Sequence, residues 1–517
     1  MAEILAKTLS LGVSGVNGFP VHVEVFATGG IPMMEIIGLP DTSVRESKNR
    51  VSAAIVNSGR ATENAYRITV NLAPADIKKE GPSFDLPIAL GVMISTGMLH
   101  PNPRINMNQT AFFGELSLDG SIQPVNGALP MAISAQENGI SNIVLPEKNA
   151  VEVSCIQGIH VYPVSHLVQV INWLEHCEGI TEQEQISFET IKNEAVIGND
   201  MSQIKGQMGA RRAIEVAAAG GHNMLMIGAP GSGKTMLARC IPGILPPMSF
   251  EESLETTRIH SIAGKIPPGG GLMVIRPFCA PHHNASVASL IGGGPNALPG
   301  EASMAHNGVL FLDELPEFTR SALEALRQPL EDGFVSIARV KKQAIYQSSF
   351  MLVAAMNPCP CGYFGSSQRA CRCTPYEIRK YADRISGPLL DRIDLQIEVD
   401  SVPLSEINNC TPSEPSAVVA ERVRRAREIQ LNRYFGSGKH CNAQLNNAEV
   451  KRYCTPDREG NRMINMAVNS LHLSMRAYQR ILKVSRTIAD LDGSEIILSA
   501  HIAEAVQYRE LDQKYWR

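Results

Sequence analysis

A glycine-rich segment in the middle of the chain contains residues that could bind phosphate groups. It reads Gly228-Ala-Pro-Gly-Ser-Gly-Lys-Thr235, follows the short apolar run 224–227 and precedes a helical pattern that opens at Met236. Glycines allow successive backbone N–H groups to face phosphate oxygens, and the amino end of the following helix adds its positive dipole. Lys234 is predicted to contact the β- and γ-phosphates of a nucleotide, and Thr235 to ligate Mg²⁺. The residues predicted to hold the nucleotide here are Gly228, Gly231, Ser232, Gly233, Lys234 and Thr235.

Two adjacent acids could complete a hydrolytic site. Asp313 and Glu314 follow the apolar run 309–312, which predicts a buried strand with both carboxylates at its carboxyl end. Asp313 would hold Mg²⁺ through water, and Glu314 would polarise the attacking water. Because a phosphate loop alone implies only binding, this acidic pair is the feature that favours hydrolysis of ATP.

Four cysteines form a cluster with the spacing Cys-x-Cys-x₉-Cys-x-Cys. Four thiolates suit a closed tetrahedral Zn²⁺ site, although each Cys-x-Cys pair is tighter than the usual Cys-x₂-Cys. The pattern favours zinc, and free thiols or redox-linked cysteines stay open as alternatives. The cluster begins two residues after Asn357, so a metal there could stiffen that position. The predicted zinc ligands are Cys359, Cys361, Cys371 and Cys373.

The elements that must position these residues divide the chain into consecutive parts. Residues 1–175 mix strand-like alternation with helical patterns, which predicts one α+β domain. Residues 176–200 are polar and acidic and predict an exposed linker. Residues 201–395 alternate strands and helices with glycine-rich turns, as is typical of a parallel α/β sheet. Residues 396–517 are helical and predict a lid domain, so the whole chain is expected to be of the α/β class.

The net charge of −4 over 517 residues excludes a uniformly basic coat for nucleic acid. The first 180 residues carry a net −6 and residues 201–517 a net +6, so a locally basic surface on the second half is still expected. No apolar run reaches the roughly 18 residues that a membrane-spanning helix needs. The amino terminus also lacks the basic start and apolar run of a signal peptide. The sequence therefore favours a cytoplasmic protein without a membrane partner.

In the order of its motifs the second half resembles the AAA+ ATPases, and within them the magnesium-chelatase-like branch. Ile204-Lys-Gly-Gln207 resembles the segment beside adenine, which places Ile204 at the nucleotide base. The resemblance implies that Asn357 is the polar sensor that helps to place the attacking water. It also implies that Arg476, at the start of a predicted helix, is a second sensor that reaches the γ-phosphate.

The same resemblance implies an arginine finger. Ser386-Gly-Pro-Leu-Leu-Asp-Arg-Ile-Asp394 resembles the segment that carries it, so Arg392 is the candidate and Arg384 is its rival. A planar guanidinium suits the charge on a transferring phosphoryl group. A finger that meets the ATP of a neighbouring subunit implies a ring, and the family implies a homo-hexamer.

The first half resembles the Lon protease domain. Lys79-Glu-Gly-Pro-Ser83 is similar to the serine segment of that family, and the likeness continues through 114–120 and 122–127. A Ser/Lys dyad needs a lysine close to the serine, and the family has it just after the Pro-x-x-Gly turn. Residues 128–132 contain no lysine. We therefore expect a retained fold, a lost peptidase activity and a helix-capping role for Ser83.

A predicted hairpin in the second half carries basic residues. Residues 334–346 read as two short strands around Arg339, Lys341 and Lys342. In the chelatase-like and DNA-helicase branches a hairpin at this place projects into the ring's pore, so the resemblance implies contact with DNA phosphates that is salt-sensitive and independent of sequence. A solvated hairpin tip is the alternative. A second arginine-rich stretch, 422–427, is more simply a solvated helix face.

Taken together, the parts resemble the bacterial ComM (YifB) family over essentially the whole chain. That resemblance implies an ATP-dependent hexameric DNA motor or helicase that acts on single-stranded and branched DNA. The implied role is branch migration of recombination intermediates during natural transformation, in competent cells. The alternative is a magnesium-chelatase-like ATPase subunit that drives remodelling of a protein partner, although the Lon-like domain and the cysteine cluster argue against it.

Overall fold

The computed structural model describes residues 4–60, 64–194, 198–267, 269–294, 297–339, 342–366, 369–400, 413–470 and 473–516. The chain forms two compact units, which are described separately. The first unit consists of Met1–Glu194, Phe250–Val274 and Gln343–Ile345, and the second of Ala195–Ser249, Ile275–Lys342 and Tyr346–Arg517. This division differs from the consecutive ranges that the sequence predicts, because two stretches of the second half are grouped with the first unit.

A seven-stranded mixed sheet forms the centre of the first unit, in the order β3-β4-β2-β1-β5-β8-β9. The three long strands β1, β2 and β4 are antiparallel neighbours, and the other pairings are parallel. Alternate residues of β2 are buried, as expected for a sheet with one covered face. The strands are β1 (Ile4–Ser14), β2 (Asn17–Gly29), β3 (Met33–Ile37), β4 (Tyr66–Ala73), β5 (Thr110–Phe112), β8 (Asn142–Pro146) and β9 (His160–Val164).

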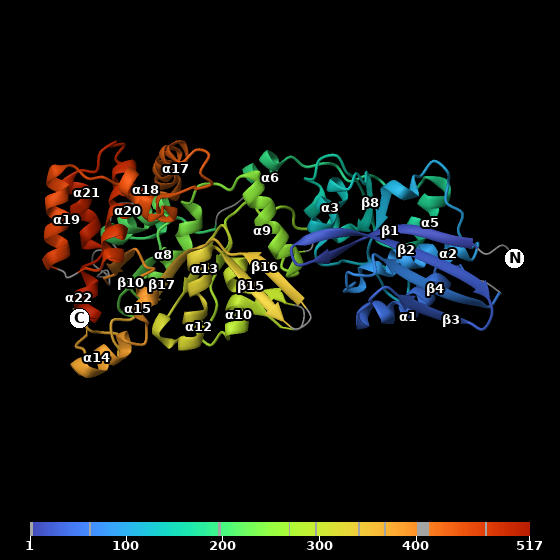
Figure 1. Cartoon of the computed structure of the whole chain (residues 1–517), viewed down its shortest axis with the longest axis horizontal. Coiled ribbons are helices and arrows are strands. Elements are labelled where there is room, and N and C mark those ends of the chain that lie inside the picture. Colours follow the sequence, from blue (N-terminus) through green and yellow to red (C-terminus); the bar gives the residue numbers. More distant parts are fainter. Residues whose placement is uncertain are drawn as a thin grey trace. The chain divides into compact units, whose positions relative to one another are not determined.

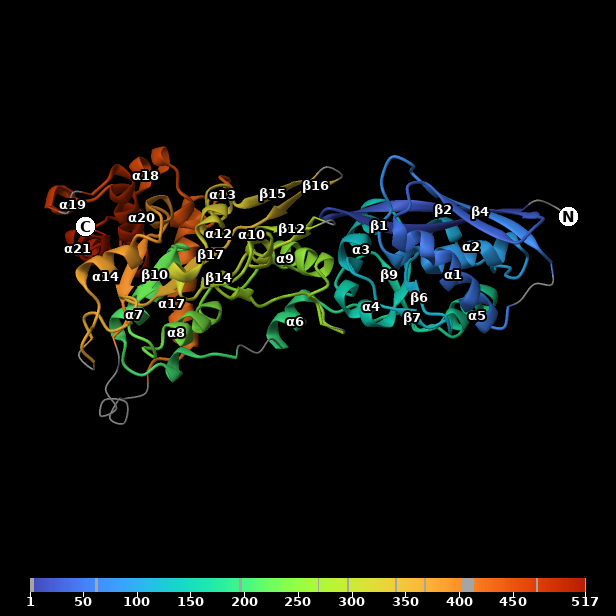
Figure 2. The ribbon, with the colours of Figure 1, turned by 90° about the horizontal axis from the view of Figure 1, so that it is seen from below.

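Helices α1 and α2 cover one side of β1, β2 and β4 (Figure 2). Between Asp85 in its first turn and Ser95 at its end, α2 is apolar on all sides, and ten of its eleven residues are buried. An all-apolar helix is stable only inside a core, so α2 is the central helix of this unit. The helices of the unit are α1 (Thr42–Asn57), α2 (Asp85–Ser95), α3 (Ala128–Glu137), α4 (Glu147–Val153), α5 (Leu167–His176), α6 (Phe188–Glu194) and α9 (Phe250–Ile262).

Helix α9 comes from the second half of the sequence and packs against α3 of the first unit. Its Ser261 Oγ donates a 2.6 Å hydrogen bond to Glu152 Oε1, and Leu272, further along the segment, is buried in the same core cluster. Burial raises the pKa of the Glu152 carboxyl, against the opposing effect of its hydrogen bonds. The ring of Phe250 packs on Phe188 of α6, with centroids 5.5 Å apart. The stretch that the sequence predicts as an exposed linker therefore contains a packed helix.

Ser83 lies in a short 3₁₀ turn, Pro82–Phe84, directly before α2, and it is buried. The predicted capping role is wrong, because the turn continues into α2 through Phe84 and no side chain caps either element. On α3, Ala132 is fully buried in an apolar cluster. Lys79 is buried too, but its Nζ donates to the carbonyl oxygens of Ile77, at 2.8 Å, and of Pro74. The amine nearest to Ser83 in sequence is thus bound to its own loop.

A five-stranded parallel sheet forms the centre of the second unit, in the order β11-β14-β17-β10-β18. Every residue of β10, β14 and β17 is buried, as expected for strands covered on both faces. The parallel α/β sheet predicted from the sequence is confirmed, and its last strand extends three residues into the range predicted as lid. The strands are β10 (Met224–Ile227), β11 (Phe278–Cys279), β14 (Val309–Leu312), β17 (Met351–Met356) and β18 (Leu395–Glu398).

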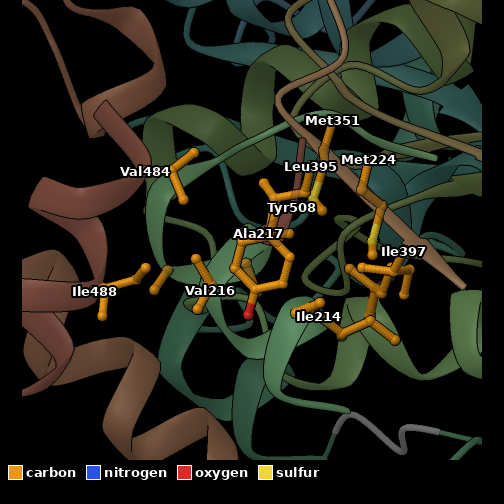
Figure 3. Close-up of a cluster of buried hydrophobic side chains, with 14 of the residues drawn as sticks. Ile214, Val216, Ala217, Met224, Met351, Leu395, Ile397, Val484, Ile488 and Tyr508 are labelled. Atoms are coloured by element: carbon orange, nitrogen blue, oxygen red, sulfur yellow. The ribbon is translucent and has the colours of Figure 1, made fainter. Parts of the chain in front are cut away.

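Helix α7 and the carboxyl-terminal helices share one hydrophobic core with this sheet. Figure 3 shows Ile214 of α7 near Ile397 of the sheet, and Val216 of the same helix on the other side of Tyr508, toward Ile488. Figure 1 shows the carboxyl-terminal helices, in orange and red, grouped together within the unit. The larger helices are α7 (Met208–Gly220), α8 (Lys234–Cys240), α14 (Pro375–Ala382), α17 (Ser416–Arg433), α18 (Asn447–Tyr453), α19 (Arg458–Ser470), α20 (Met475–Leu491), α21 (Ser499–Gln507) and α22 (Leu511–Trp516).

In the described part of the chain, no helix has the length and apolar character needed to cross a membrane.

The environment of Ser83 predicts that the protein does not cleave casein, with or without ATP. Residues 128–132, where the family has the lysine that takes the serine's proton, contain none, and Lys79 is bound to carbonyl oxygens of its own loop. Release of labelled peptides from casein measures the activity, with Ser83→Ala as the matched control. Cleavage by the wild type that disappears in Ser83→Ala would contradict this expectation.

Candidate active site

The phosphate loop joins β10 to α8, and two of its glycines have backbone conformations that other residues rarely adopt. Gly231 has φ +77° and Gly233 φ +92°, both in the left-handed region. Gly228 is required for another reason, since a Cβ there would lie 2.3 Å from Val399 O. The loop therefore has the conformational freedom that a phosphate cradle needs.

Lys234 lies inside this loop and is buried. Its Nζ donates to Gly228 O at 2.7 Å and Ala229 O at 3.0 Å, and Asn357 Oδ1 lies 3.4 Å away. Burial lowers the pKa of the ammonium, while the nearby carboxylates of Asp313 and Glu314 act to raise it. The predicted lysine and sensor asparagine are thus together, and the amine can exchange backbone carbonyls for phosphate oxygens.

Thr235 and Asp313 are the pair predicted to serve Mg²⁺, and their side chains touch. Thr235 Oγ1 donates a 2.9 Å hydrogen bond to Asp313 Oδ2, while Asp313 Oδ1 accepts from the backbone N–H of Glu314 at 2.9 Å. A hydroxyl and a carboxylate are the hard oxygen donors that Mg²⁺ prefers. The residues present therefore fit the ion.

Glu314 has φ +52°, an uncommon conformation for a residue other than glycine. Its Oε2 lies 3.0 Å from His283 Nδ1, which comes from the loop after β11. The sequence did not single out His283 as a partner of Glu314. The signal was weak, because adjacent histidines in a long irregular loop are common. A cavity of about 280 Å³ lies here, lined by Thr235, His283, Phe278, Phe311, Asp313 and Glu314.

The segment predicted to lie beside adenine contacts the phosphate loop. The Gln207 side chain donates to Ser232 O at 3.4 Å and also to Asp400 O. Ile204 is buried in the large core cluster, and its backbone oxygen accepts a 2.5 Å hydrogen bond from Ser413 Oγ. The structure thus places this segment next to the loop, with Ile204 anchored at its base.

The two finger candidates have different environments. Arg392 is only 10% exposed; its NH1 donates to Pro388 O at 2.5 Å and its NH2 pairs with Glu331. Burial and the neighbouring arginines, with Arg327 first among them, lower the pKa of Arg392. Arg384 is 52% exposed and lies 2.9 Å from Glu317. Each guanidinium is thus held by an acid of its own chain, and Arg392 must leave two partners before it can reach another subunit.

The second sensor candidate is also held by an acid. Arg476 lies at the start of α20, whose first turn is capped by the Ser474 side chain. Its guanidinium is 71% exposed and lies 3.2 Å from Asp391 Oδ2, next to Arg392 in sequence. Because this side chain is so exposed, the exchange of its carboxylate partner for a phosphate costs little free energy.

The four predicted zinc ligands converge. All four Sγ atoms lie within 4.8 Å of one another, and three of the separations are 3.3, 3.6 and 3.7 Å. Tetrahedral Zn–S bonds of about 2.3 Å place sulfur atoms about 3.8 Å apart, so the cluster fits the ion. The loop also packs on the phosphate loop, since a Cβ on Gly362 would lie 2.7 Å from Pro230 Cδ.

The two arginine- and lysine-rich stretches differ in what the structure describes. The hairpin is present as β15 (Phe334–Arg339) and β16 (Lys342–Gln347), while Lys341 and the side chains of Arg339 and Lys342 lie outside what the structure describes. On α17 the arginines are engaged within the unit, which favours the solvated-face interpretation. Arg424 and Arg425 pair with Glu421, Arg422 pairs with Glu215 and Glu414, and Arg427 donates to Ala218 O and His440 O.

Comparisons with known proteins agree with this site and fold. Three family models match: "Magnesium chelatase, subunit ChlI" over residues 200–407, "Subunit ChlI of Mg-chelatase" over 23–149, and "Magnesium chelatase, subunit ChlI C-terminal" over 413–509. The chain is also 27% identical to Lon protease 2 of Bacillus subtilis over 180 residues, or 31% of each chain. This partial match fits the Lon-like fold of the first unit.

Several relatives match over nearly their full length. The chain is 42% identical over 509 residues to the competence protein ComM of Haemophilus influenzae, covering 98% of both chains. It is 41% identical over 500 residues to YifB of Escherichia coli, covering 96% of both. With the phosphate loop, the acidic pair and a Lon-like first unit in one chain, the protein belongs to the ComM/YifB family of magnesium-chelatase-like AAA+ ATPases.

Proposed function

We propose that the protein is an ATP-hydrolysing hexameric ring motor that moves on DNA and promotes branch migration of recombination intermediates during natural transformation. The observation that carries the motor activity is the convergence of Lys234, Asp313 and Asn357 at one edge of the parallel sheet. The role in transformation rests on the full-length similarity to a relative named as a competence protein.

Each residue of the site has a defined task in this proposal. Lys234 binds the β- and γ-phosphates, and Thr235 and Asp313 hold Mg²⁺, which neutralises charge on the phosphates when bound. Glu314 orients and polarises the attacking water, with Asn357 beside it. His283 holds the Glu314 carboxylate at 3.0 Å in this structure and must release it before the water can bind there.

The proposed hydrolysis also needs an arginine finger, and because we assign that finger to a neighbouring subunit, we propose a ring. We assign Arg392 as the finger supplied to the ATP of a neighbouring subunit, with Arg384 as the alternative, and Arg476 as the second sensor. A guanidinium that meets the developing charge adds transition-state stabilisation that Lys234 and Mg²⁺ alone do not supply. A protomer that lends its finger to a neighbour is a complete enzyme only within a closed ring, and a homo-hexamer is the state that we propose.

Contact with DNA is assigned to the β15–β16 hairpin through Arg339, Lys341 and Lys342. The second half of the chain has a net charge of +6, and the arginines of α17 are largely neutralised by adjacent acids. We therefore place the DNA contact of the second half on the hairpin rather than on α17. A second function, remodelling of a protein partner, is favoured by the family models named for magnesium chelatase, and the test below separates the two.

We further propose that the four clustered cysteines bind Zn²⁺. A closed Cys₄ site would fix the loop that packs against Pro230 and begins two residues after Asn357. Its role would be structural support of the ATP site.

Replacement of the predicted base should separate ATP binding from hydrolysis. Glu314→Gln keeps the shape of the side chain but cannot polarise water, so we expect kcat to fall about 10²–10⁴-fold with ATP affinity retained. Lys234→Ala should instead lose ATP binding. Titration with a fluorescent ATP analogue and phosphate release measure the two effects, and hydrolysis by Glu314→Gln at the wild-type rate would exclude this role.

DNA should stimulate the ATPase, and the stimulation should depend on the hairpin. We expect single-stranded and four-way DNA to raise kcat, and the change of Arg339, Lys341 and Lys342 to Ala to abolish the increase and reduce the salt dependence of binding. The matched control is the double variant Arg424→Ala, Arg425→Ala, which removes arginines already paired with Glu421. A wild-type ATPase that ignores DNA and moves no branch point would contradict the DNA motor and favour a protein substrate.

The purified protein should contain about one zinc ion per chain, as expected for one closed Cys₄ site. We expect Cys359→Ser to lose it, whereas Cys177→Ser, at an exposed cysteine outside the cluster, should retain it. Elemental analysis after purification without metal-binding tags measures both. Equal zinc content in the two variants would argue strongly against this site.

A further inference from the structure

Glu331 lies at the base of the hairpin that we assign to DNA. It belongs to the last turn of α13 (Arg327–Asp332), which ends at Gly333 with φ +73°, directly before β15. Ser348 N donates to Gly333 O at 2.8 Å and so closes the base of the hairpin beside this turn. The Glu331 carboxylate is 58% exposed and forms an ion pair with Arg392.

Arg392 is held at this place without being fully satisfied. Its NH1 and NH2 have partners in Pro388 and Glu331, but Nε is buried and has no hydrogen-bond partner among the described residues. A guanidinium has five donors, and a buried donor without an acceptor is costly. These contacts therefore hold Arg392 in place but leave one of its buried donors without an acceptor among the described residues.

The backbone beneath Arg392 is firmly anchored on the side away from the hairpin. Asp394 is buried between Arg480, at 3.0 Å, and His222, at 3.3 Å; burial acts to raise the pKa of its carboxyl, but Arg480 and the hydrogen bond with His222 lower it overall. Arg509 donates to Ile393 O at 2.7 Å from the carboxyl-terminal helices. Relative movement between Arg392 and Glu331 must then arise mainly on the side of α13 and the hairpin.

We propose that Glu331 is a positioning residue that retains Arg392 in its own protomer until the hairpin moves. The proposal rests on the assignment of Arg392 as the finger under the proposed function. One guanidinium cannot pair closely with Glu331 and also reach the phosphates of a neighbouring subunit. Displacement of the hairpin by DNA would carry α13 with it, break this ion pair and free the finger, so DNA binding would control hydrolysis through a single carboxylate.

The test is Glu331→Gln, with Asp332→Asn as the matched control on the adjacent exposed acid. Loss of the charge should release Arg392 without DNA, so we expect the DNA-free kcat to rise several-fold at unchanged KM for ATP. The fold-stimulation by DNA should fall correspondingly, while Asp332→Asn should behave as the wild type. Damage to the fold would lower kcat, so a rise cannot come from that source. A DNA-free rate in Glu331→Gln equal to or below that of the wild type would overturn the proposal.

Arg392→Ala separates failure of this inference from failure of the finger assignment. If Arg392→Ala hydrolyses ATP at the wild-type rate, the assignment of the finger itself is wrong. If Arg392→Ala is inactive and Glu331→Gln is indistinguishable from the wild type, only the role of Glu331 is excluded. The double variant should match Arg392→Ala, because a retaining residue has no effect when its arginine is absent.

Discussion

The parallel register of three buried strands is the constraint on which the ATP site depends. In the sheet, β17 lies between β10 and β14, with Ile227 opposite Met356 and Leu312 opposite Ala354. Because the three strands run in one direction, the phosphate loop, Asn357 and Asp313 all leave the sheet at its carboxyl edge. Since every residue of these strands is buried, a register shift by one residue would exchange the two covered faces and scatter the site.

The first unit combines a Lon-like fold with the absence of a lysine from residues 128–132, where the family has the base of its Ser/Lys dyad. The position where a Lon-type lysine is expected lies in α3, where Ala132 packs in an apolar core. An apolar residue in that place adds to packing and cannot take a proton from a serine. The unit also contains α9, which follows the phosphate-loop helix α8 along the chain. The two units are therefore joined by more than one stretch of polypeptide.

Three arginines that were assigned to the ATP site are paired with acidic side chains of the same chain. Arg384, Arg392 and Arg476 were each expected to face phosphates or another subunit, and each is paired with an acid of its own chain. Such pairs have modest strength where solvent reaches them. They can hold a side chain in one state of a motor and release it in another, as a cycle that alternates between states requires.

The sequence by itself determined the phosphate loop, the acidic pair, the parallel sheet and the missing lysine, because these depend on residues adjacent or regularly spaced along the chain. The boundaries of the units, the packing of α9 against α3, the pairing of His283 with Glu314 and the binding of Arg392 by Glu331 were decided only by the tertiary structure. In each of these cases the partners are far apart in sequence or equally compatible with solvent. The sequence indicates that a helix or strand face is apolar, or that a side chain is charged. Only the folded chain determines which core that face joins and which counter-charge that side chain meets.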